Sequence, residues 1–549
     1  MLPSSVAERL ARLAPDQRDA ATAPPGPVLC VAPAGSGKTT TLVARICWRI
    51  ATGTDPARIC ALTFNKRAAD ELAERLAAAV EPLGVDPKTV RVRTFHALGR
   101  EILADAGVDV TRLVDRAAFL AQMMGRAVVG AELRLVDDVF SRLTLDPERG
   151  PPADDERGAA LRAAYARYRG ALAEQHALDF DDLVARALAL LSDDEATRLA
   201  WRERCSTLFV DEAQDLDRSQ LELALILCEP ARDVFLVGDD DQTIYAWRLA
   251  DVRRILRLAA ALPGLRRVDL ETNYRCPAEV VARSVRLVEH GVERFAKRIR
   301  AGPRAGGNLI LAADTGDFVA CARRLLGSWY GREDGRYAVL ARTNAELAPY
   351  AAVALERGIP YHATEDGLVL DDPGLDVVLA ALPGASNGAE PGSDGGSDER
   401  QASGSWWLID LDRRLLEQPD LSRELVRSVL AWAVAFPTPG AFRSAIAEAR
   451  SARSQLRRED ARLVLATVHT TKGLEFDHVA VVGMDHGTFP SERSLGESPD
   501  PVRALEEERR LAYVAWTRAR RSLVLVYDAA APSVFLTEAF DPDELAPVG

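Results

Sequence analysis

The chain has 549 residues, of which 48% are apolar and 28% are charged, values that exclude bulk disorder. One hydrophobic core supports roughly 250 to 300 residues, so at least two domains are expected. The formal charge of -13 argues against nonspecific coating of nucleic acid, so any nucleic-acid site must be a local channel.

The cysteines and the N-terminus exclude further classes. Seven scattered cysteines without a CxxC pair argue against a zinc ribbon, an iron–sulfur cluster or a disulfide framework. We expect them to be small buried apolar residues in a reducing compartment. The N-terminus lacks a basic region followed by an apolar core, and no uncharged apolar run of about 18 residues occurs. A cytoplasmic protein with no membrane segment is expected.

Short apolar runs alternate with longer amphipathic segments, which is typical of a parallel α/β sheet. In the first half, the predicted buried strands are residues 28–32, 59–63, 208–210 and 234–237. After residue 267 the alternation resumes, with strands predicted at residues 338–340, 463–467, 479–482 and 523–527. Two α/β lobes follow from this repetition.

Two long stretches interrupt this alternation. Residues 100–176 are rich in Ala, Leu and Arg at helical spacing and predict a helical insertion in the first lobe. Residues 384–405 are rich in Gly, Ser, Asp and Glu and predict a flexible connector inside a second insertion, 372–460. The predicted lobes are residues 1–99 with 177–268, and residues 269–371 with 461–549.

The segment APAGSGKT at residues 32–39 has the context of a phosphate-binding loop, because it follows a predicted strand and opens a predicted helix. Its glycines let backbone N–H groups approach phosphate oxygens, Lys38 reaches the β/γ-phosphates, and the Thr39 hydroxyl ligates Mg²⁺. An ordinary glycine-rich turn is the alternative. The predicted ATP contacts in this loop are Ala34, Gly35, Ser36, Gly37, Lys38, Thr39 and Thr40.

The segment LFVDEAQD at residues 208–215 supplies a second, acidic site at the end of an apolar strand. Asp211 would hold Mg²⁺ directly or through water, and Glu212 would position and deprotonate the attacking water. A carboxylate pair at a strand end is usually a solvated turn. Because this carboxylate pair follows a phosphate-binding loop in a predicted parallel sheet, the catalytic interpretation is favoured.

With both sites in place, the chain resembles the UvrD/Rep/PcrA-type superfamily 1A DNA helicases through an ordered series of motifs in both lobes. The resemblance implies an α/β fold of two tandem RecA-like P-loop lobes with helical insertions. Residues 13–17 (LAPDQ) resemble the Q motif, in which Gln17 would read the adenine edge. Residues 270–275 (LETNYR) resemble motif IV, in which Tyr274 stacks on adenine and Arg275 reaches the γ-phosphate.

Three further residues are implied to act on the nucleotide. Gln242, in the motif III-like segment 237–248, would sense the γ-phosphate, and Glu475, in a segment that resembles motif V, would contact the ribose. Arg518, in a segment similar to motif VI, would be the arginine finger. Because Arg275 and Arg518 belong to the second lobe, the resemblance implies that the transition state is assembled when the lobes close around ATP.

The resemblance also implies a track for single-stranded DNA. Tyr245 and Trp247 lie two residues apart after a strand, so they can present their faces to the same side, and stacking a base on each would contribute about 1–3 kcal/mol. For Phe64 and His96, packing at strand ends is the alternative. The implied DNA contacts are Phe64, Asn65, Thr94, His96, Tyr245, Trp247, Arg342 and His469.

The sequence departs from the family at three places. Pro33 replaces a common glycine but leaves Gly35 and Gly37 in place, so activity is expected to survive. Thr40 stands where relatives carry an arginine that stacks on adenine, which leaves the nucleotide preference open. The second insertion is far shorter than the family's regulatory 2B subdomain.

These features predict an ATP-dependent 3′-to-5′ translocase or helicase on single-stranded DNA and at single-strand/duplex junctions, acting in repair, recombination or replication restart. The short second insertion favours an alternative, an ATPase that strips proteins from single strands without processive unwinding. An inactive nucleic-acid scaffold is a third interpretation, against which the complete set of ATP-site residues argues. A monomer in solution, with repair or replication proteins as partners, is expected.

Overall fold

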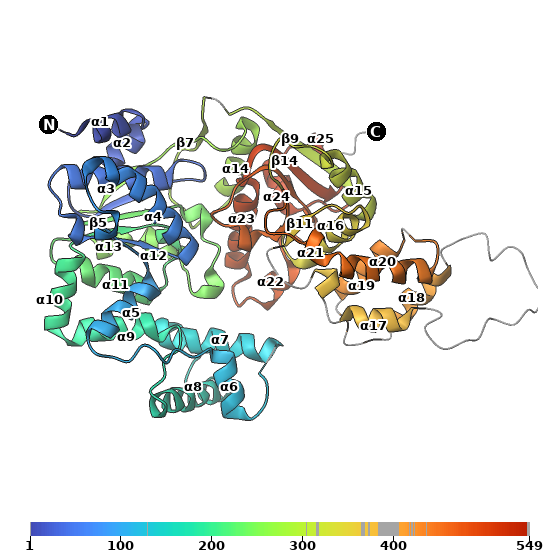
Figure 1. The fold of residues 1–549 in the computed structure, drawn as a ribbon, viewed down its shortest axis with the longest axis horizontal. Helices are drawn as coiled ribbons and strands as arrows, with labels where there is room; N and C mark the ends of the chain where they lie inside the picture. Colours follow the sequence, from blue (N-terminus) through green and yellow to red (C-terminus); the bar gives the residue numbers. More distant parts are fainter. Residues whose placement is uncertain are drawn as a thin grey trace, which may run out of the picture. The chain divides into compact units, whose positions relative to one another are not determined.

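The computed structural model describes residues 2–545 except 129, 304, 315–317, 364–367, 372–373, 383–405, 417, 419–420, 422 and 435. The predicted connector at 384–405 therefore lies outside the described residues. The chain forms two compact units (Figure 1). Unit 1 comprises Met1–Tyr274 and Glu293–Arg300, and unit 2 comprises Arg275–Val292 and Ala301–Gly549.

Unit 1 is built on a six-stranded parallel sheet in the order β3-β2-β4-β5-β1-β6. Every residue of β1, β2, β4 and β5 is buried, because helices cover both faces, and this explains the unbroken apolar runs. The strands are β1 (Val28–Val31), β2 (Ile59–Thr63), β3 (Arg91–Thr94), β4 (Thr207–Val210), β5 (Val234–Gly238) and β6 (Arg266–Asp269).

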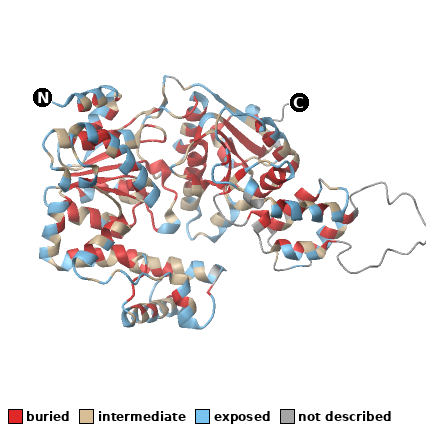
Figure 2. Cartoon of the chain, in the orientation of Figure 1, coloured by how far each residue is buried: buried red, intermediate tan, exposed pale blue. Residues whose placement is uncertain are grey.

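Two apolar cores flank this sheet, one on each face. One face is packed by α1 (Ser4–Ala11), α2 (Pro15–Ala21), α3 (Lys38–Ala51) and α4 (Lys66–Val80). The other is packed by α5 (Phe95–Asp105), α9 (Asp182–Asp193), α10 (Glu195–Arg204), α11 (Arg218–Cys228), α12 (Val252–Leu256) and α13 (Leu258–Ala261). In Figure 2 the buried residues follow the strands and the helix faces turned toward them.

A small helical layer is inserted between α5 and α9. It consists of α6 (Arg116–Met124), α7 (Gly130–Leu145) and α8 (Glu156–Glu174). These helices have an apolar core of their own, in which Phe119 and Phe140 pack against Tyr168. The Arg116 guanidinium bonds to both Asp179 and Asp181 at 2.7 Å, which fixes the layer to the segment that leads into α9.

Unit 2 has a second six-stranded parallel sheet, in the order β11-β12-β10-β13-β14-β9. Its strands are β9 (Asn308–Asp314), β10 (Tyr337–Ala341), β11 (Tyr361–Ala363), β12 (Leu463–Thr467), β13 (Phe476–Val481) and β14 (Ala519–Asp528). Its helices outside the insertion are α14 (Ala278–Glu289), α15 (Phe318–Trp329), α16 (Asn344–Glu356), α22 (Glu492–Glu497), α23 (Pro501–Trp516), α24 (Val534–Ala539) and α25 (Pro542–Leu545). A separate two-stranded sheet pairs β7 (Thr272–Asn273) with β8 (Arg300–Ala301).

A helical insertion of unit 2 packs directly on the lobe. Its helices are α17 (Gly374–Ala381), α18 (Trp406–Leu416), α19 (Arg423–Ala433), α20 (Pro439–Ser451) and α21 (Arg453–Leu456). The rings of Trp432 and Phe442 meet edge to face at 5.3 Å. These side chains belong to the same apolar core as α15 and α16, so the insertion has no separate core of its own among the described residues.

These observations bear out the predicted α/β class with tandem parallel sheets. All eight predicted strands are present, with ends shifted by a few residues at most. The seven cysteines are buried and unbridged, as expected. No described helix is long and apolar enough to span a bilayer.

Candidate nucleotide site and nucleic-acid interface

The predicted catalytic residues of unit 1 come from neighbouring strands. Strand β5 lies between β4 and β1, and all three are parallel, so the loops that follow them leave the same edge of the sheet. These loops carry Lys38 after β1, Asp211 and Glu212 after β4, and Gln242 after β5. The topology thus brings together residues that lie up to about 200 positions apart in the sequence, as ligand sites of parallel sheets require.

The loop after β1 has a backbone that only glycine accepts easily. Gly35 and Gly37 have φ values of 68° and 84°, and a Cβ on Gly37 would lie 2.6 Å from Nε2 of Gln17. Helix α3 begins at Lys38, with Thr39 half-buried and Thr40 exposed in its first turn. Ala34 and Ser36 are buried, and the Ser36 hydroxyl has no hydrogen-bond partner among the described residues.

Both predicted adenine contacts are attached to this loop. The Gln17 side chain donates through Nε2 to the Ser36 carbonyl at 2.8 Å and accepts from the Ala14 amide at 3.1 Å. The Tyr274 amide donates to the Gly35 carbonyl at 2.9 Å, while half of the Tyr274 residue is exposed (50%). Tyr274 is thus held at the glycine loop through its main chain.

The acidic pair lies opposite Lys38. Glu212 has left-handed backbone geometry, with φ of 52°, and its Oε2 atom lies 3.6 Å from Nζ of Lys38. Asp211 is buried, and its amide is bonded to the Leu62 carbonyl of β2 at 2.9 Å. Burial, reinforced by the charge of Glu212, raises the pKa of Asp211 to about 7. Because the ionised form of Asp211 is destabilised by burial, a cation bound beside it would stabilise that form.

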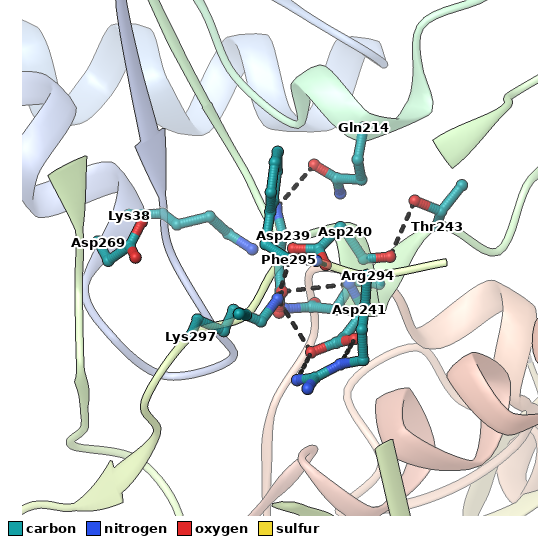
Figure 3. A network of polar contacts seen from close by, with 12 residues as sticks. Lys38, Gln214, Asp239, Asp240, Asp241, Thr243, Asp269, Arg294, Phe295 and Lys297 are labelled. Atoms are coloured by element: carbon teal, nitrogen blue, oxygen red, sulfur yellow. Dashed lines mark hydrogen bonds and ion pairs between the residues drawn. The ribbon is translucent and has the colours of Figure 1, made fainter. Parts of the chain in front are cut away.

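A buried glutamine to which the sequence motifs assign no role links this pair to the next loop. Gln214 donates through Nε2 to Oε2 of Glu212 at 2.6 Å and accepts at Oε1 from the Asp239 amide at 3.0 Å. Asp239 in turn accepts at Oδ2 from Nε2 of Gln242 at 2.7 Å. Figure 3 shows the side-chain oxygen of Gln214 directed at Asp239. Predicted catalytic residues are therefore connected by consecutive hydrogen bonds.

The residues present fit ATP with Mg²⁺. The Ser36 hydroxyl and the first-turn amides of α3 suit phosphate oxygens, since N–H groups at a helix start are anion-binding donors. Thr39 and Asp211 offer the hard oxygen ligands that Mg²⁺ prefers. Burial and the charge of Glu212 raise the pKa of Asp211, and a cation bound there would lower it. A triphosphate with its cation would supply what these groups lack.

Three predicted nucleotide residues gather in unit 2 around the turn between α23 and β14. Arg275 donates through Nε to Glu475 at 2.7 Å and through Nη1 to the Thr517 carbonyl at 3.3 Å. The Arg518 residue is only 2% exposed, and it donates to the carbonyls of Val514 (2.9 Å) and Leu474 (3.1 Å). The predicted arginine finger is thus held by main-chain acceptors of its own unit.

The rings of Phe64, Tyr245 and Trp247 contact one another in series, and we call these three residues the aromatic surface. The rings of Phe64 and Tyr245 are stacked, 5.0 Å apart and 10° from parallel. The Tyr245 and Trp247 rings are neighbours, with centres 6.1 Å apart and planes 74° from parallel. Their edge-to-face arrangement accompanies a turn of 3-10 helix at Ala246–Arg248. Trp247 is 58% exposed, with Arg248 4.6 Å from its ring centre.

Asn65, Thr94 and His96 lie where two helices of the same sheet edge begin. Asn65 caps α4 by accepting from the Ala68 amide, and Thr94 caps α5 by accepting from the Ala97 amide. His96 stacks at 3.9 Å on Phe180, a residue that is 56% exposed. Burial lowers the pKa of His96 to about 4, so its ring is neutral at pH 7.

The two remaining predicted DNA contacts lie in unit 2, where they follow the carboxyl ends of β10 and β12. The turn that carries Arg518 lies at the opposite edge of this parallel sheet, before β14. Arg342 is paired with the buried carboxylate of Glu508, with Nη2 and Oε1 2.7 Å apart, and also donates to Ser494. His469 lies in the turn Val468–Thr471, and burial, followed by the charge of Arg342, lowers its pKa to about 4.

Comparison with known proteins identifies two matching family models. The model of the UvrD/REP helicase N-terminal domain matches residues 13–124 and 132–263, and that of the UvrD-like helicase C-terminal domain matches residues 441–530. The chain is 30% identical to ATP-dependent DNA helicase UvrD2 of Mycobacterium tuberculosis (strain ATCC 25618 / H37Rv), over 94% of this chain and 78% of that protein. It is 25% identical to ATP-dependent DNA helicase Rep (93% and 90%) and 27% identical to DNA helicase II (93% and 84%), both of Escherichia coli (strain K12).

Proposed function

The chain belongs to the UvrD/Rep family of superfamily 1 DNA helicases, and from that premise we propose that it is an ATP-driven motor that moves 3′ to 5′ along single-stranded DNA. One observation carries the proposal. The hydrogen-bonded series Glu212–Gln214–Asp239–Gln242 ends three residues before the aromatic surface that starts at Tyr245. ATP-site residues and base-stacking side chains therefore share one loop.

In the proposed hydrolysis each unit 1 residue has one task. Lys38 and the amides of the glycine loop would bind the β- and γ-phosphates. Thr39 and Asp211 would hold Mg²⁺, which when bound would neutralise charge that develops on the phosphates. Glu212 would position the attacking water and accept a proton from it, and Gln242 would sense the γ-phosphate. The proximity of Lys38 to Glu212 supports these assignments.

Residues of unit 2 would complete the chemistry. We assign Arg275 and Arg518 to charge stabilisation on the γ-phosphate, with Glu475 as the ribose contact. Their clustering around one turn supports a common role. Gln17 and Tyr274 would recognise adenine. Their hydrogen bonds to the glycine loop support this.

The aromatic surface is proposed to bind DNA by stacking, because stacking tolerates any base and suits a motor that passes over every sequence. Asn65 and Thr94, as helix caps, would bring phosphates to the first-turn amides of α4 and α5. Arg342 and His469 would contact the strand from unit 2. Repair, recombination or replication restart is the proposed setting.

A second candidate is the stripping of proteins from single strands without processive unwinding. One observation favours it, namely that the described helices α17–α21 share the core of α15 and α16. An insertion held by the lobe's own core is poorly suited to move separately. Displacement of a labelled recombinase from single-stranded DNA, without strand separation on a forked duplex, would select this candidate.

The primary test is steady-state ATP hydrolysis with and without single-stranded DNA, for the wild type and Glu212→Gln. Strong stimulation by DNA that the substitution abolishes is expected, because Glu212 is the proposed base. Equal rates with and without DNA would contradict coupling to a track. Full activity of Glu212→Gln would contradict the assignment of the base.

A further inference from the structure

Three successive carboxylates are buried in the loop after β5. Asp239, Asp240 and Asp241 are at most 2% exposed. Ionised carboxylates at such depth need cationic partners, because their desolvation is costly. The family resemblance assigned a role to Gln242 in this loop but none to the acidic residues before it.

The cationic partner of these three carboxylates comes from a segment that is distant in the sequence. Residues 293–300 belong to unit 1, although the chain on both sides of them belongs to unit 2. Lys297, in this segment, has a side chain with no exposed surface, and its Nζ lies 2.6 Å from Asp239, 2.5 Å from Asp240 and 2.9 Å from Asp241. Figure 3 shows Lys297 pointing into the three carboxylates.

Two further contacts fix the segment on this loop. Arg294 holds both oxygens of Asp241, at 3.0 and 2.9 Å, and the Phe295 amide donates to Asp240 at 2.7 Å. The Arg267 guanidinium lies 4.4 Å from the centre of the Phe295 ring, which adds a contact between the segment and β6. The loop is thus held by both main-chain and side-chain groups of residues 294–297.

Asp239 connects Lys297 to Gln242 through its two carboxylate oxygens. Its Oδ1 atom accepts from Lys297 and its Oδ2 atom accepts from Nε2 of Gln242, at 2.7 Å. A carboxylate only accepts hydrogen bonds, so the Gln242 amide must turn its NH₂ group toward Asp239. Lys297 therefore fixes Asp239, and Asp239 fixes both the position and the orientation of the Gln242 amide.

We propose that Lys297 is a positioning residue for ATP hydrolysis, which acts through Asp239 to hold Gln242 in the orientation that the reaction needs. The proposal rests on the proposed ATPase function and adds a residue to it. A purely stabilising ion pair would act independently of Gln242, whereas the proposed effect of Lys297 on ATP hydrolysis depends on Gln242.

The test uses a substitution that keeps the charge balance. Three carboxylates against Lys297 and Arg294 leave one excess negative charge, and the double variant Asp240→Asn/Lys297→Met leaves the same excess. Burial raises the pKa of Asp240 to about 6, so a neutral amide at position 240 is a mild change. Asp240→Asn alone is the matched control, because it keeps Lys297 on Asp239 and Asp241.

In full-length protein with single-stranded DNA, the double variant should lower kcat roughly 10- to 100-fold with little change in the KM for ATP, because misplacement of a group that acts on the γ-phosphate affects the reaction step more than ATP binding. The control should stay within about threefold of the wild type. In a Gln242→Ala background the same double substitution should have no further effect, because residues acting through one group are non-additive.

Three outcomes would overturn the proposal: a double variant as active as its control, a parallel rise in KM, or an equal loss in the Gln242→Ala background. Folding is checked by circular dichroism and thermal unfolding. If the double variant does not fold, Asp239→Asn decides, because Lys297 and Gln242 bond to different oxygens of Asp239 and Asn would place an NH₂ donor against one of them. Unchanged kcat in that variant would then overturn the proposal. A wild type without Glu212-dependent hydrolysis would instead contradict the proposed function.

Discussion

The Nε atom of Arg275 donates to Oε2 of Glu475 at 2.7 Å, so residues assigned to the γ-phosphate and to the ribose form one ion pair. Arg520 lies 3.3 Å from the other oxygen of Glu475. The carboxylate therefore has two arginine partners, of which only Arg275 also bonds to the Thr517 carbonyl. The two arginines thus differ in what holds them, and Arg520 can serve as a control for the proposed role of Arg275.

Arg275→Ala should lower kcat for ATP by at least about 10³-fold, because an arginine on the transferred phosphoryl group contributes about 10³ to 10⁵ in rate. Stability should change by about 1 kcal/mol or less, since the Glu475 side chain is 40% exposed and its ion pair is screened. Arg520→Ala is the control and should keep its activity. Steady-state kinetics and urea unfolding measure both effects. A kcat within roughly tenfold of the wild type would remove Arg275 from the mechanism.

Trp247→Ala should weaken binding of single-stranded DNA by about 1–3 kcal/mol, the free energy of stacking one base. ATP hydrolysis without DNA should be unchanged, because the residue is 58% exposed and lies outside the hydrogen-bonded series from Glu212 to Gln242. Tyr330→Ala, which removes an aromatic residue 64% exposed in unit 2, is the matched control. Fluorescence anisotropy with a labelled oligonucleotide gives the affinities. Equal losses in the two variants would argue against a dedicated stacking surface.

Gly37→Ala should raise the KM for ATP at least about tenfold, because its φ of 84° suits glycine and the new Cβ would lie 2.6 Å from Nε2 of Gln17. Gly53→Ala is the control, since Gly53 also has positive φ (105°) but a Cβ added there would meet no atom within 4 Å. Backbone strain is thus common to both variants, whereas the contact with Gln17 arises only at position 37. Similar KM values in both variants would show that the contact is unimportant.

Acid should destabilise unit 1 through His96. Burial lowers the pKa of His96 to about 4 from an ordinary value near 6.5, so its stabilising contribution is present above about pH 6.5 and is lost as the pH falls toward 4. The loss from this one group is up to about 3 kcal/mol. Urea unfolding at pH 7 and pH 4.5 should therefore show a smaller decrease for His96→Gln than for the wild type. Substitution of the exposed His290 with Gln should leave the decrease unchanged; an equal decrease in His96→Gln would contradict the assignment.

The sequence by itself determined the two parallel sheets and supplied most of the residues proposed for the ATP site. Continuous apolar runs are unambiguous when a strand is buried on both faces, as in β1, β2, β4 and β5. The glycine loop before Lys38 and the acidic pair at Asp211 were identified because short segments fix both their residue types and their local backbone.

Only the tertiary structure decided which distant groups meet. Lys297 reads as an ordinary surface lysine in the sequence, and its burial among three carboxylates arises because residues 293–300 return to unit 1. Gln214 became a link between Glu212 and Asp239 only once β4 and β5 were neighbours. The orientation of Trp247 depended on a turn of 3-10 helix that alternation rules do not predict. Local pattern sets the backbone and the chemistry available, whereas long-range packing sets which charges and rings face one another.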